Sequence, residues 1–117
     1  MYGKTLNEMV DVVVVWAGEQ GRKYPNGLES AKIKSNENVE FGKVNYPSEI
    51  GEFISTVKAE IAQMSDSSLR KFENGLLHVP EERGFTYGQI SMLNAIRSAV
   101  FIEIENRQNK TEKQPLI

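Results

Sequence analysis

The chain has 117 residues, no cysteine and a formal net charge of −2. A length of this order is typical of one domain with its own core, and the lack of cysteine excludes disulfides, thiolate zinc sites and a cysteine nucleophile. The sequence pI near 5.5 disfavours general nucleic-acid binding, for which a pI above roughly 9 is typical. The longest apolar run, residues 12–17, is shorter than the roughly 20 residues of a membrane span. We therefore expect a soluble cytoplasmic protein without a membrane segment.

The first predicted element is a helix that begins near residue 6. Thr5 and Glu8 have the spacing of a capping box, in which two side chains satisfy amide groups at a helix start. Gly18 and Gly21 are stop signals at its far end. The four consecutive valines at 12–15 favour a strand instead, because their branched Cβ atoms are stiff in a helix, so a strand across residues 8–17 stays open. The apolar face of the predicted helix consists of Leu6, Met9, Val10, Val13, Trp16 and Ala17.

An irregular stretch follows, with a predicted turn and a small β-hairpin. Residues 24–27 read Tyr-Pro-Asn-Gly, in which proline presets φ and Asn-Gly tolerates a positive φ. Apolar residues then alternate with polar ones on both sides of residues 35–38, which predicts a short hairpin. An isolated hairpin is barely stable in water, so this one would have to pack on helices. Its apolar positions are Ala31, Ile33, Val39 and Phe41.

Two further helices are predicted next, over about residues 48–64 and 65–77. In the first, acidic residues occupy the first turn, where the helix dipole favours negative charge, and the apolar residues share a single face. Gly75 weakens the end of the second, at a cost of about 1 kcal/mol relative to alanine. Residues 78–85 are predicted as a connector, because Pro80 and Gly84 interrupt them. The residues predicted to face inward are Ile50, Phe53, Ile54, Val57, Ile61, Met64, Leu69, Phe72 and Leu76.

The last predicted helix, about residues 86–107, is apolar on two sides. Thr86 and Gln89 repeat the capping-box spacing at its start. At 100° per residue one stripe contains Ile90, Leu93, Val100 and Ile104, flanked by Ile96 and Phe101; the other contains Met92, Ala95, Ala99 and Ile102. A helix of this kind must bury both sides, within its own fold or against another chain. The fold class predicted is a mainly α, compact bundle of about four helices, with the hairpin between the first two. We expect one domain over residues 1–107 and a flexible tail over 108–117.

Arg97 lies in the middle of the first stripe, where a guanidinium is costly to bury unless it is paired. One interpretation is a structural salt bridge, or an aliphatic stem that extends to solvent. The other is that the helix forms an interface anchored by Arg97, since arginine is enriched among binding hot spots. The predicted interface residues are Met92, Ala95, Arg97, Ala99 and Ile102. The occupant would be an unidentified protein partner or a second copy, because twofold dimers are the commonest oligomers.

Nucleic-acid binding is the disfavoured alternative. The basic residues that would contact phosphates are Arg22, Lys23, Lys32, Lys34 and Lys43. Residues 22–46 hold five bases against three acids, a small local excess for phosphate binding. The eight-residue connector 78–85 is also long for a helix-turn-helix motif, whose turn has about 3–4 residues.

An enzyme that uses the single histidine is the third hypothesis. Glu81 or Glu82 would orient His78 as a general base, but no serine or cysteine motif surrounds it. One histidine does not make a typical zinc site, and residues 18–21 lack the lysine and serine of a phosphate loop. We therefore expect no catalytic residue, no cofactor and no metal. The leading hypothesis is a small non-enzymatic accessory or inhibitory protein, of the kind associated with phages and plasmids, that docks on a macromolecular partner.

Overall fold

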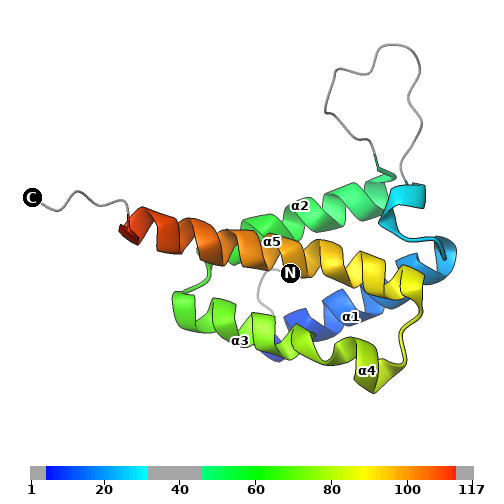
Figure 1. Cartoon of the computed structure of the whole chain (residues 1–117), viewed down its shortest axis with the longest axis horizontal. Helices are drawn as coiled ribbons and strands as arrows, with labels where there is room; N and C mark the ends of the chain where they lie inside the picture. The colour runs from blue at the N-terminus through cyan, green and yellow to red at the C-terminus, as the bar shows by residue number, and fades with distance from the viewer. Residues whose placement is uncertain (1–4, 32–45, 113–117) are drawn as a thin grey trace, which may run out of the picture.

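The computed structural model describes residues 5–31 and 46–112. The elements in chain order are α1 (Leu6–Lys23), the 3-10 helix η1 (Leu28–Ala31), α2 (Ser48–Gln63), α3 (Asp66–Leu77), α4 (Val79–Arg83) and α5 (Tyr87–Glu112). The long helix α5 is central, and α1, α2 and α3 all pack against it (Figure 1). The predicted mainly α bundle of four principal helices is confirmed.

The predicted β-hairpin is not supported, because the described part of the chain contains no strand. Ala31, which would have begun the hairpin, is buried at the end of η1. The turn before it is formed as predicted, with the Gly27 amide donating to the Tyr24 carbonyl at 2.9 Å. The Leu28 amide then donates to the Ser91 hydroxyl of α5 at 2.8 Å, which fixes η1 against the bundle. The remaining hairpin positions, 33–41, lie outside the described residues.

The valine run at 12–15 is helical, so the strand alternative is wrong. The Thr5 hydroxyl accepts a hydrogen bond from the Glu8 amide at 3.2 Å, which confirms the predicted cap. Val13 and Val14 are buried while Val15 is 58% exposed, a pattern that follows helical rather than strand periodicity. The packing of two adjacent valines against the bundle outweighs their small intrinsic preference against helix.

The first helix does not stop at its glycines, because α5 crosses it there. A Cβ atom built on Gly21 would lie 2.3 Å from the Cα of Gln89, and one built on Gly88 would lie 2.6 Å from the carbonyl oxygens of Gly21 and Tyr24. The two backbones are therefore in direct contact. Gly21 acts as a packing residue and α1 continues to Lys23.

Gln89 connects the same crossing by hydrogen bonds. Its side-chain oxygen accepts from the Thr86 amide at 2.9 Å, and the Thr86 hydroxyl accepts from the Gln89 amide at 3.4 Å, so the predicted capping box is confirmed. Its side-chain nitrogen donates to the Gly18 carbonyl of α1 at 3.1 Å. One buried side chain thus caps α5 and attaches it to α1.

The second and third helices begin and end within about a residue of the predicted bounds, and Ser65 caps α3 through the Ser68 amide. The predicted connector 78–85 instead contains the short helix α4. Pro80 lies in its first turn, where the missing amide hydrogen is not needed. Gly84 ends it with a φ of +62°, a conformation that favours glycine.

Helix α5 extends to Glu112, so the predicted end at residue 107 is five residues too early. Its two apolar stripes form the edges of one wide buried face, which includes Leu93, Ile96 and Val100 together with Met92 and Ala99. The helices of the same chain cover this face. For these residues the interpretation of α5 as the central helix of its own fold is correct.

Candidate functional site

The predicted interface divides between the core and the surface. Met92 and Ala99 are buried within the bundle, which corrects their assignment as contact residues, because a partner cannot reach them in the folded chain. Ala95 is half-buried, and Ile102 is 56% exposed. The sequence pattern placed these four residues on one stripe but could not show where the covering helices end.

Arg97 lies in a surface groove of about 440 Å³ between α3 and α5. It is half-buried, and its Nη1 donates to the Asn94 side-chain oxygen one turn earlier, at 3.2 Å. Among the described residues no carboxylate forms an ion pair with it, although Glu73 lines the same groove. The groove lining consists of Glu73, Asn74, Leu76, Leu77, Asn94, Arg97, Ser98, Val100 and Phe101.

Two large apolar side chains flank Arg97 in this groove and are largely open to solvent. Phe101 is 54% exposed and Leu77 is 44% exposed. The apolar spacing places Phe101 on the flank of the first stripe and predicts nothing about Leu77, because spacing identifies the apolar face of a helix but not the elements that cover it. Single exposed apolar residues are ordinary. Arginine is enriched among binding hot spots, so the groove that contains Arg97, Phe101 and Leu77 is the candidate docking surface.

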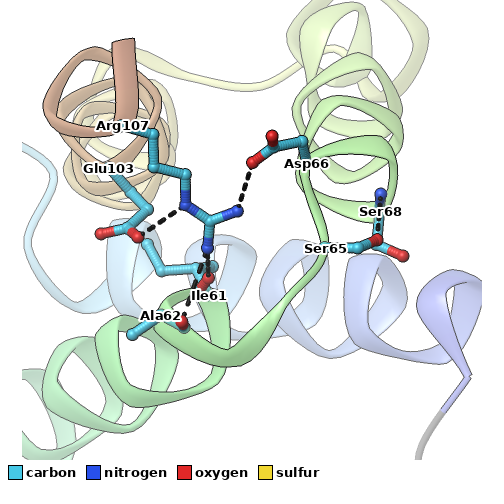
Figure 2. Close-up of polar contacts among 7 residues, drawn as sticks. All are labelled: Ile61, Ala62, Ser65, Asp66, Ser68, Glu103 and Arg107. Atoms are coloured by element: carbon cyan, nitrogen blue, oxygen red, sulfur yellow. Dashed lines mark hydrogen bonds and ion pairs between the residues drawn. The ribbon is translucent and has the colours of Figure 1, made fainter. Parts of the chain in front are cut away.

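A second arginine of α5, Arg107, has several hydrogen-bond and ion-pair partners (Figure 2). Its Nη1 donates to Asp66 at 2.8 Å and its Nε to Glu103 at 2.9 Å, and these carboxylates raise the pKa of the guanidinium. Its Nη2 donates to the carbonyls of Ile61 and Ala62 at 3.1 and 3.5 Å. Those carbonyls belong to the last turn of α2, where a cation is favourable. Arg107 therefore joins α5 to the α2–α3 junction and has a structural role that the sequence analysis missed.

The variant Arg107→Gln is expected to lower the midpoint of urea unfolding, because it removes the cation from the carbonyls at the end of α2 and from Asp66. The measurement is denaturation followed by circular dichroism. Lys58→Gln, on the exposed side of α2, is the matched control and should shift the midpoint no more than an ordinary surface substitution. Equal shifts in the two variants would contradict the structural role of Arg107.

The basic residues proposed for nucleic-acid contact are only partly described. Arg22 and Lys23 are exposed in the last turn of α1. Lys23 forms an ion pair with Glu49 of α2, and the hydrogen bond and charge of that carboxylate raise the pKa of the lysine. Lys32, Lys34 and Lys43 lie outside the described residues. Of the two described bases, Lys23 is already paired with Glu49. Arg22 and Lys23 therefore do not strengthen the hypothesis of phosphate binding.

His78 joins α3 to α4 at the surface. Its side chain is 70% exposed, and Nδ1 lies 3.8 Å from a Glu81 oxygen whose side chain is 75% exposed. Both side chains of this pair are therefore largely open to solvent. Within residues 5–31 and 46–112 no three histidine or acidic side chains gather in a way that would hold a metal ion. None of the described helices combines the length and apolar character needed to cross a membrane.

Comparison of the chain with models of known protein families, with curated proteins and with solved structures finds no match. The case for a function therefore depends on the geometry of the groove and of the surfaces around it.

Proposed function

We propose that this chain is a small non-enzymatic accessory or inhibitory protein that docks on a protein partner through the groove between α3 and α5. The observation that carries the proposal is Arg97, half-buried in the groove without an ion-pair partner among the described residues.

A guanidinium in this position favours an acidic or carbonyl-bearing partner. Arg97 is held by Asn94 on its own helix, so its orientation is partly fixed before binding, which lowers the entropic cost of complex formation. Its remaining donors can form bidentate bonds to a carboxylate. Phe101 and Leu77 would supply apolar contact on either side. Arginine and aromatic residues are enriched in protein interfaces, and Arg97 and Phe101 lie in the same groove, which supports the proposal.

The test compares wild type with Arg97→Ala in affinity purification from a lysate of the native source, with and without nuclease. We expect one dominant, nuclease-resistant protein with wild type, and capture reduced by about tenfold or more with the variant, the effect of a hot-spot residue. Lys58→Ala, on an exposed side of α2 outside the groove, should capture as much as wild type.

Equal capture by Arg97→Ala and wild type would contradict docking through this groove. Partners that disappear with nuclease would favour the nucleic-acid alternative instead. Because Arg97 is not part of the core, circular dichroism of the variant should match that of wild type, so a loss of capture reports on the surface.

A further inference from the structure

A second surface contains an apolar slot of about 380 Å³ between α1 and α2. Its lining is Asp11, Val12, Val15, Trp16, Glu19 and Phe53. No residue of this slot lines the Arg97 groove. The inference made from it is therefore independent of the function proposed above.

Two stacked aromatic rings make the slot rigid. The rings of Trp16 and Phe53 are 4.5 Å apart between centroids and inclined by 11°. The Trp16 Nε1 donates to the Glu49 carbonyl at 3.0 Å, so its indole is fixed in orientation. Phe53 is half-buried, and Val15 beside it is 58% exposed. A partner would thus meet a preformed apolar surface, which reduces the ordering cost of binding.

The two charged residues that line the slot are both acidic. Asp11 and Glu19 stand four residues before and four residues after Val15, and both are exposed. At 1.5 Å per residue, their backbones are ~12 Å apart along α1 with the apolar valine halfway between them. No base lines the slot among the described residues.

We infer that this slot binds a basic amphipathic helix of a partner protein. A helix laid alongside α1 meets Asp11, Val15 and Glu19 with residues at its own positions i, i+4 and i+8. The complementary sequence is therefore a base, an apolar residue and a base at that spacing, with the apolar side chain entering the slot beside Trp16 and Phe53. This is the helix-in-groove mode of recognition, and the acidic ends of the slot select the charge of the occupant.

Trp16 allows a direct test, because it is the only tryptophan of the chain. The probe is a helical peptide of roughly 18 residues, built from leucine and lysine with the leucines on one face and no tryptophan. Its control is the same peptide with glutamate in place of every lysine. We expect a saturable change in Trp16 emission with the lysine peptide that weakens between about 50 and about 500 mM salt, and no change with the glutamate peptide.

Two variants separate the slot from the overall charge of the protein. Asp11→Asn combined with Glu19→Gln should raise the Kd for the lysine peptide by about tenfold. Glu82→Gln combined with Glu105→Gln changes the net charge equally, on α4 and α5, and should leave the Kd within about twofold of wild type. Val15→Lys, at an exposed position, should abolish the emission change without unfolding the chain.

Three results would overturn the inference. The first is an unchanged Trp16 emission with the lysine peptide. The second is an equal loss of affinity in the two double variants, which would show attraction to net charge alone. The third is an emission that depends on protein concentration without peptide, which would show that a second copy of the chain occupies the slot.

Discussion

Replacing Gly21 with alanine is expected to lower the free energy of unfolding by about 3 kcal/mol or more, the upper part of the range for overpacked sites. The new methyl carbon would lie 2.3 Å from the Cα and 2.4 Å from the nitrogen of Gln89. These are backbone atoms of α5, so the strain cannot be relieved by a side-chain rotation. The helices must separate, which also strains the hydrogen bond from Gln89 to Gly18. Urea denaturation followed by circular dichroism measures the change.

Gly51→Ala is the matched control, since it makes the same substitution within α2, where a Cβ would meet no atom of the described residues within 4 Å. It is expected to raise stability by about 0.5–1 kcal/mol, through the lower chain entropy of the unfolded state and the better helix propensity of alanine. Gly88→Ala, on the other side of the crossing, should behave like Gly21→Ala. If Gly21→Ala and Gly51→Ala were equally stable, the close crossing of α1 and α5 would be refuted.

The variant Ala99→Glu is expected to destabilise the fold by at least about 3 kcal/mol, because it places a carboxylate without a partner in the core. Ala99 is 6% exposed in the middle of α5. Domains of this size have a total stability of about 5–15 kcal/mol, so the variant should be close to unfolding at 37 °C. Thermal unfolding by circular dichroism is the measurement. Substitution of an interface residue on the surface would instead weaken a complex and leave the stability of the monomer unchanged.

Ile102→Glu provides the comparison on the same helix. This residue belongs to the same predicted stripe but is 56% exposed, so its variant should remain within about 0.5 kcal/mol of wild type. A fully stable Ala99→Glu protein would instead show that this side of α5 is open and would restore Ala99 as a contact residue.

The local signals of the sequence located most of the helices. The caps at Thr5, Ser65 and Thr86 each depend on a partner three residues away, so they can be read from the chain alone. The same holds for the turn at residues 24–27 and for the apolar spacing of α2 and α3. The four valines at 12–15 favour a strand by intrinsic preference, whereas the apolar spacing around them favours a helix. The run is helical because Val13 and Val14 pack into the bundle.

The end of α1, the burial of side chains and the pairing of the arginines depend on residues far apart in the sequence, so they follow only from the folded structure. Glycine often marks the end of a helix, yet Gly21 lies inside α1, where its missing side chain lets the backbone of α5 pass close by. Arg97 and Arg107 are ten residues apart on one helix and look alike in the sequence. Only the positions of α2 and α3 make Arg107 a structural link and leave Arg97 in an open groove. Helix periodicity is set by residues within one or two turns, whereas burial and pairing are set by the contacts that the folded chain brings together.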